Sequence, residues 1–380
     1  MDDASDTAFR RDVLASCGAS EAVADELLAH SSATGAAMPE ALPPLPLDDE
    51  PHVEAWREYA ADARRAGVLP ALRARLVQLR FPIREGMSRE PGYLAATRRG
   101  DVGEGEAFAP GLALHDADGL ALDVYPTSAG HVPIVVASDR RDFVSLVQAF
   151  TGRNEPVHVA DSVGACMVSG LNNWDRVARH RAAWERGRAG NAPDDTWTAE
   201  FTRMKARREL YQDRFILLSR GAYSGVQAFA LGLAEQDWLD RSLVIRREHE
   251  CEHYLVFRLT GHVPHRVLDE LAADCVGIVR AFGSYRPDIA LCCLGLELAT
   301  GVRPGGRLEA YRGTPPVSGA AFHVLAEVCR RAIARLDVLS RAWRLQAAGP
   351  DGLAPFVCAI SRLSLEHLAG GRGGWPAAAR

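Results

Sequence analysis

A possible metal-binding motif lies in the stretch RREHECEHYLVFRLTG, from Arg246 to Gly261. It is an H-E-x-x-H motif formed by His249, Glu250 and His253. Residues four apart on a helix share a face, so both histidines could direct a ring nitrogen at one ion. Neutral imidazole binds Zn²⁺ well, with bonds of about 2.0–2.1 Å. Glu250 would then reach an activated water rather than the ion, which is where a general base belongs.

A catalytic zinc site needs a third protein ligand and one open position. The downstream stretch LDELAADCVGI contains Glu270 and Asp274, which lie one helical turn apart. Sixteen residues separate His253 from Glu270, enough to end one helix, turn, and bring a second helix back alongside. We therefore predict that Glu270 is the third ligand. Asp274 is expected to accept a hydrogen bond from the outer ring nitrogen of a ligand histidine, as metal-bound imidazoles usually require.

These motifs resemble the gluzincin class of zinc metallopeptidases, which includes thermolysin. In that class H-E-x-x-H is followed, on a second helix, by E-x-x-x-D, and DELAAD is similar to that helix. The resemblance covers about Ser242 to Ile278. It implies a Zn²⁺-dependent hydrolase that acts on a peptide or amide bond with Glu250 as base, and we expect a restricted small substrate. The longer stretch also resembles an uncharacterised family of bacterial proteins, which implies no activity.

Several alternatives use the same residues. An inverted H-x-x-E-H motif would make Glu252 the base. Iron at the same ligands would give an oxidative enzyme, and a zinc ion that only joins two helices would give a non-catalytic binding module. A di-iron site would need a second E-x-x-H pair, which we do not find, and Leu259 stands where a metzincin would place its third histidine. Cys251 falls on the opposite side of the helix from the two histidines, so we expect a packed thiol.

A hydrolase of this kind also needs a donor for the oxyanion that develops at the attacked carbonyl. The candidates lie downstream of the ligand helices and are Tyr285, Arg286, Tyr311 and His323, of which we select the last two. Residues that follow two predicted strands could line a cleft and bind substrate. These residues are Asn172, in GACMVSGLNNW, and Arg220 and Tyr223, in FILLSRGAYSGV.

The elements that must position these residues predict an α+β fold. Short β-rich runs alternate with helices in the middle of the chain, and helical periodicity dominates the C-terminal half. We expect three parts: a helical N-terminal region with a proline-rich linker (1–100), an α/β segment (101–225) and a helical metal-binding region (226–380). The first ligand helix should end at Gly261 and the second at Gly283.

Composition narrows the possible partners. The chain has 380 residues, 47% of them hydrophobic, and a formal net charge of −5. The charge gives no reason to expect nucleic acid or an anionic membrane as the main partner. The eight cysteines form no C-x-x-C pair, there is no apolar run of 18 residues, and the acidic N-terminus does not have the pattern of a signal peptide. We therefore expect a cytoplasmic protein that acts on a small peptide or amide.

Overall fold

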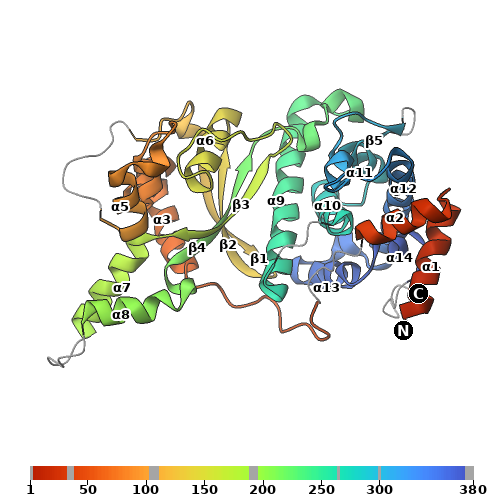
Figure 1. Ribbon diagram of the computed structural model, residues 1–380. Coiled ribbons are helices and arrows are strands. Elements are labelled where there is room, and N and C mark those ends of the chain that lie inside the picture. Colours follow the sequence, from red (N-terminus) through yellow and green to blue (C-terminus); the bar gives the residue numbers. More distant parts are fainter. Residues whose placement is uncertain are drawn as a thin grey trace. The chain divides into compact units, whose positions relative to one another are not determined.

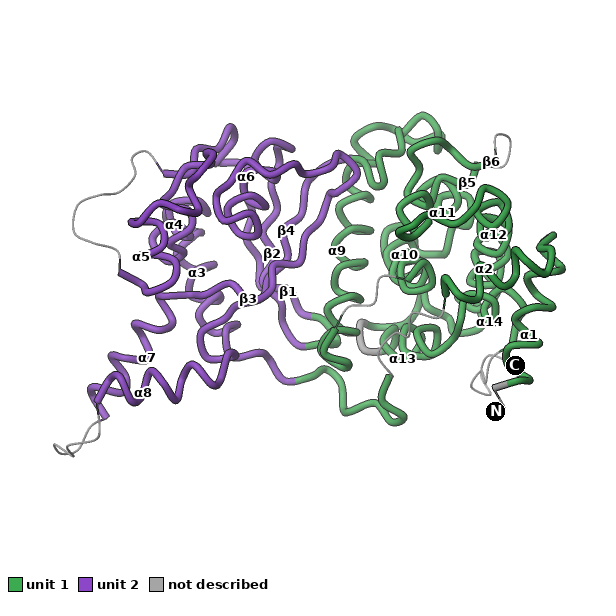
Figure 2. The backbone as a smooth tube through the Cα atoms, in the orientation of Figure 1, with its two compact units in different colours: residues 1–47, 127–129, 222–380 green, residues 48–126, 130–221 purple. Residues whose placement is uncertain are grey.

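The structure is a computed structural model, and it describes residues 3–31, 38–101, 111–187, 196–262, 266–297 and 301–372. The chain forms two compact units (Figure 2). Unit 1 comprises Met1–Leu47, Thr127–Ala129 and Ala222–Arg380, and unit 2 comprises Asp48–Pro126 and Gly130–Gly221. The fold is α+β, as the sequence predicts: many helices accompany one four-stranded sheet and one two-stranded sheet.

Unit 2 contains the four-stranded sheet, with the strand order β1-β2-β4-β3. β2 and β4 are parallel, and β3 runs antiparallel to β4. The strands are β1 (Ala121–Thr127), β2 (Gly130–Ala137), β3 (Ala165–Asn172) and β4 (Gln212–Ser219). The helices of this unit are α3 (Val53–Ala66), α4 (Val68–Arg75), α5 (Pro91–Arg99), α6 (Arg140–Phe150), α7 (Trp174–Gly187) and α8 (Trp197–Lys205).

The core of unit 2 forms around the buried run of β4. Phe215 is fully buried between rings from two helices. Its ring centroid lies 4.7 Å from that of Trp56 on α3 and 5.0 Å from that of Phe150 on α6. The apolar stretch FILL is therefore the central strand around which this unit packs.

A buried carboxylate also ties elements of unit 2 together. Asp213, on β4, accepts hydrogen bonds from Trp56 Nε1 at 2.8 Å and from Asn173 Nδ2 at 2.7 Å. Its other oxygen pairs with Arg176 Nη1 at 2.7 Å. Both oxygens of the carboxylate thus have fixed protein donors, and one of these donors carries the balancing charge.

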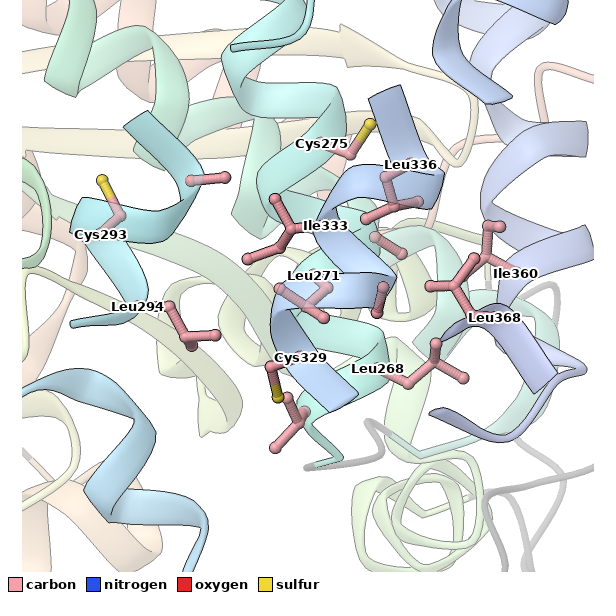
Figure 3. Close-up of a cluster of buried hydrophobic side chains, with 14 of the residues drawn as sticks. Leu268, Leu271, Cys275, Cys293, Leu294, Cys329, Ile333, Leu336, Ile360 and Leu368 are labelled. Atoms are coloured by element: carbon pink, nitrogen blue, oxygen red, sulfur yellow. The ribbon is translucent and has the colours of Figure 1, made fainter. Parts of the chain in front are cut away.

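Unit 1 is almost entirely helical (Figure 1). Its helices are α1 (Asp3–Ser16), α2 (Glu21–Ser31), α9 (Glu235–Thr260), α10 (Val267–Phe282), α11 (Pro287–Leu294), α12 (Gly319–Ala342), α13 (Pro350–Ser361) and α14 (Leu365–Ala369). Two short strands, β5 (Leu296–Glu297) and β6 (Gly301–Val302), and the 3₁₀ helices η5 (Tyr223–Gly225) and η7 (Arg307–Tyr311) complete its site-bearing part. Figure 3 shows the core, where Leu271 and Cys275 of α10 lie close to Ile333 and Leu336 of α12.

α9 and α10 pack against each other along their lengths. Both end where predicted, at glycines in the left-handed conformation: Gly261 with φ 83° and Gly283 with φ 74°. The close approach requires Gly277, because a Cβ there would lie 2.7 Å from the Ile245 carbonyl oxygen. This contact is one turn from His249 on α9, so it sets the spacing of the two helices next to the predicted ligands.

The two units divide the N-terminal region differently from our prediction. Residues 1–47, which include α1 and α2, belong to unit 1 together with the C-terminal helices. Residues 48–100 belong to unit 2 with the sheet. The last division, between residues 221 and 222, lies close to the expected boundary at 225. Within the described residues, none of the helices combines the length and apolar character that a membrane span requires.

Candidate metal centre

Three side chains converge where α9 faces α10. His249 and His253 come from one face of α9, and Glu270 comes from α10. The two Nε2 atoms lie 3.0 Å apart, and each lies 3.4 Å from one carboxylate oxygen of Glu270. Both histidines are buried, and the Glu270 side chain is 12% exposed. The three residues predicted as ligands are thus the group in the described chain that could hold a metal ion.

The separations of these atoms suit zinc. Tetrahedral bonds of about 2.0–2.1 Å place ligand atoms about 3.3–3.4 Å from one another. The observed separations of 3.0 and 3.4 Å require only small adjustments. The group also attracts positive charge. Burial disfavours the charged imidazolium of His249, but the hydrogen bonds and charges of Asp274 and Glu270 outweigh burial and raise the pKa of His249 to about 10. In the metal-free cluster this charge is a proton, which a bound metal would replace.

Glu270 is held in its charged form. Burial disfavours the carboxylate, yet hydrogen bonds from His249 and His253 outweigh burial and hold the pKa of Glu270 well below its usual range. The charge of this carboxylate also acts on Tyr311, on η7. Burial, followed by the negative charge of Glu270, raises the pKa of Tyr311, so this phenol keeps its proton. Tyr311 therefore lies close enough for the charge of Glu270 to act on it, and its role as a donor stays a prediction.

Asp274 lies behind His249, in its predicted place. Its Oδ1 is 2.8 Å from His249 Nδ1, and its Oδ2 pairs with the guanidinium of Arg307. Burial opposes ionisation of Asp274, but the charge of Arg307 and the hydrogen bond from His249 outweigh it and lower its pKa. An ionised acceptor on Nδ1 directs the Nε2 lone pair of a neutral His249 toward His253 and Glu270, as metal ligation needs.

Tyr223 has a different position from the one we predicted. It was expected to bind substrate, but it is buried at 5% exposure on η5. Its hydroxyl donates to Asp274 Oδ1 at 2.6 Å, lies 3.1 Å from His249 Nδ1, and accepts a hydrogen bond from Arg307 Nη1 at 3.0 Å. These bonds occupy the hydroxyl, so Tyr223 supports the cluster from behind and offers no free polar group to a substrate.

Arg307 is the site residue that sequence reasoning missed. It and Tyr311 lie four residues apart at the two ends of η7. Arg307 pairs with Asp274 on α10, and Tyr311 is affected by the charge of Glu270, one turn earlier on the same helix. η7 is thus tied to the ligand helix through the Arg307–Asp274 ion pair. The sequence signal was the matching spacing R-x-x-x-Y in the glycine-rich loop GVRPGGRLEAYRG, from which we selected only the tyrosine.

The remaining residues of the motif are Glu250, Cys251 and Glu252, and they differ in burial. Glu250 is half-buried, and no hydrogen bond or ion pair joins its carboxylate to another described side chain. Glu252 is buried, and its Oε2 has no partner among the described residues. Burial, followed by the charge of Glu248, raises the pKa of Glu252 to about 8. Cys251 is buried, as predicted for a packed thiol, and burial raises its pKa well above the usual range.

Other predicted site residues lie elsewhere in the fold. His323 is exposed on α12, and its Nδ1 lies 2.8 Å from the Gly319 carbonyl oxygen of the same helix. No contact brings it to the cluster within the described chain, so our prediction of a catalytic role for His323 is not supported. The Tyr285 hydroxyl is buried and has no hydrogen-bond partner among the described residues.

Two predicted substrate-binding residues belong to unit 2. Asn172 ends β3, and its side-chain oxygen accepts a hydrogen bond from Gln212 Nε2 at 3.1 Å. Arg220 is exposed just after β4, where its backbone N–H donates to the Ala137 carbonyl at 2.9 Å. The cluster belongs to unit 1, so the roles of Asn172 and Arg220 stay predictions.

Comparison with known protein families identifies one match. The family described as "Family of unknown function (DUF7005)" matches residues 12–372. This is nearly the whole chain, so the protein belongs to that family. Searches of curated proteins and of solved structures found no match.

Proposed function

We propose that the protein is a Zn²⁺-dependent hydrolase of the gluzincin type that cleaves a peptide or amide bond of a restricted substrate. The observation that carries the proposal is the convergence of His249 Nε2, His253 Nε2 and the Glu270 carboxylate, with Asp274 behind the first histidine. A bound zinc ion would supply a Lewis acid and lower the pKa of its water to about 7.

The chain's own residues would divide the remaining work. Glu250 accepts a proton from the attacking water and passes it to the leaving amine. Tyr311 keeps its proton because its pKa is raised, so its hydroxyl can donate to the developing oxyanion. Asp274, with Arg307 and Tyr223 around it, holds the His249 ring in one orientation. Arg307 therefore acts through Asp274.

The contrast between the two candidate bases favours Glu250 over Glu252. A general base must reach the water and exchange its proton with the leaving group. Glu252 is buried, and it lies near the charge of Arg280 on the neighbouring helix. Glu250 is half-buried, and no described partner occupies its carboxylate. This difference supports the H-E-x-x-H assignment rather than the inverted motif.

The ligand set favours catalysis over a purely structural zinc. Structural sites are commonly closed by four protein ligands, often cysteines. Here the described residues supply three ligands, none of them a cysteine. Cys251, although it is part of the motif, is outside the group.

The test is hydrolysis of a panel of N-blocked dipeptide amides by the zinc-loaded protein and by Glu250→Gln. The wild type should cleave at least one member. The variant should keep its zinc and fold while turnover falls about 10²–10⁴-fold, the usual contribution of a general base. Glu252→Gln is the matched control and should change turnover much less. Loss of zinc in Glu250→Gln would make Glu250 a ligand and favour the iron-dependent alternative. Equal activity of wild type and Glu250→Gln would refute the hydrolytic role.

A further inference from the structure

A cavity of about 300 Å³ lies in unit 1. It is bounded by the end of α2, the start of α10, η7, α12 and the connection between α13 and α14. Its volume is at the lower end of the range for small-molecule pockets, about 300–1,000 Å³. Its aliphatic lining consists of Val267, Leu268, Ala310, Leu325, Leu363 and Leu365.

Three polar side chains of the lining, His30, Arg266 and Ser364, already have partners. His30 Nε2 donates to the Tyr311 carbonyl at 2.9 Å. The guanidinium of Arg266 makes bonds of 2.7 and 2.8 Å to Asp269, which matches its charge. Ser364 caps α14. A charged ligand group would lose water here without gaining an unpaired counter-charge, so the cavity suits a neutral apolar group.

Tyr311 joins the cavity to the metal cluster. It lines the cavity, its carbonyl accepts a hydrogen bond from His30, and the negative charge of Glu270 acts on its hydroxyl. Arg266, on the same wall, is the N-cap residue of α10, four residues before Glu270. A group in the cavity would therefore lie against a residue on which the charge of a predicted metal ligand acts.

We propose that this cavity is the specificity pocket for a neutral, branched aliphatic group of the substrate, with Tyr311 as the wall between the pocket and the reacting bond. This inference rests on the proposed hydrolytic function. The pocket would select amides that carry a leucine-like side chain over those that carry a polar or charged side chain of similar size. The selection is physical: an amide side chain in the cavity would lose its hydrogen bonds to water.

The test measures binding rather than cleavage. N-acetyl-leucinamide and the nearly isosteric N-acetyl-asparaginamide are titrated by NMR into zinc-loaded Glu250→Gln protein, which should not turn them over. Leucinamide should bind at least about tenfold more tightly, because the asparagine amide would lose hydrogen bonds to water that the cavity does not replace. Ala310→Leu adds volume to the cavity wall from an exposed position and should weaken leucinamide binding by a similar factor.

Ala320→Leu is the matched control, since Ala320 is exposed on α12 and does not line the cavity. It should leave binding unchanged, and both leucine variants should keep their zinc. Leu325→Trp, which fills the cavity from its buried side, gives an independent check. The inference fails if the two probes bind equally, or if leucinamide binds Ala310→Leu as well as it binds Ala320→Leu. Failure of the hydrolase proposal would be seen separately, as an absence of cleavage by the wild type.

Discussion

Each unit of the protein contains a carboxylate surrounded by polar side chains, and the two clusters differ in how that charge is satisfied. In unit 2, Asp213 receives three directed hydrogen bonds, and one donor, Arg176, is a permanent cation. In unit 1, Glu270 faces two histidine nitrogens that also face each other at 3.0 Å. Imidazole carries its charge only when protonated, so this second cluster needs a proton or a metal ion to be satisfied.

The comparison teaches how a structural network differs from a binding site. Burial and polarity are common to both clusters. What separates them is that both oxygens of Asp213 have fixed protein donors, whereas the ring nitrogens of His249 and His253 and the Glu270 carboxylate face a common point that a proton or a metal ion must occupy. The predictions below use this difference, from the largest expected effect to the smallest.

Breaking the unit 2 cluster should cost stability and leave metal binding intact. Asp213→Asn removes the charge that balances buried Arg176, and an unpaired buried charge typically costs about 3–5 kcal/mol. Urea denaturation should show this loss, while the metal content per chain stays the same. Asp237→Asn, which breaks the exposed ion pair with Arg241, is the control and should change stability by less than about 1 kcal/mol. Metal loss in Asp213→Asn would undo the distinction between the clusters.

Protons should compete with metal only in the unit 1 cluster. The pKa of His249 is raised to about 10, so below that pH metal binding must release a proton. The apparent zinc affinity should therefore rise with pH between 6 and 9, by about tenfold per unit for one released proton. Competition titrations with a chelator of known pH dependence would measure the slope. A flat profile would mean that His249 is not a ligand.

Removing the carboxylate behind His249 should weaken the metal site without abolishing it. Asp274→Ala should lower zinc affinity by about 10–100-fold, the usual effect of losing such a partner. Asp274→Asn should do less harm, because the amide oxygen can still accept the bond from Nδ1. If Asp274→Asn lost all metal while Glu270→Gln retained it, the roles of the two carboxylates would be reversed.

The smallest effect is expected for Tyr223→Phe. The phenol donates one of the hydrogen bonds to Asp274, but His249 and Arg307 remain as donors. Zinc affinity should fall only a few-fold, as expected for one net hydrogen bond worth about 1 kcal/mol. The KM for a cleaved substrate should stay within twofold, since the hydroxyl is buried. A large rise in KM with unchanged zinc affinity would restore the substrate-binding role first predicted for Tyr223.

The sequence predicted the parts of the site that depend on local spacing. The i, i+4 pairs His249–His253 and Glu270–Asp274 define helix faces, and Gly261 and Gly283 end the two helices where a left-handed residue is needed. Once two helices joined by a short connection are antiparallel, the pairing of those faces follows. The α+β class could be predicted from periodicity for the same reason.

The parts that depend on long-range contacts were not predictable in the same way. Arg307 reaches Asp274 across 33 residues, and no local pattern shows that contact. Tyr223 sits in a glycine-flanked turn, a context that equally suits a cleft residue, and only its packing under His249 reveals its position. The association of residues 1–47 with the C-terminal helices likewise depends on tertiary packing.

The central claim is that His249, His253 and Glu270 bind one metal ion. Elemental analysis of protein purified without added metal tests it most directly, on the wild type and on His249→Ala and Glu270→Ala, with Asp213→Asn as the control from the other unit. We predict close to one zinc per chain in the wild type and in Asp213→Asn, and almost none in the two ligand variants. Full metal content in either ligand variant, or a wild type that neither contains zinc nor takes it up on titration, would contradict the claim.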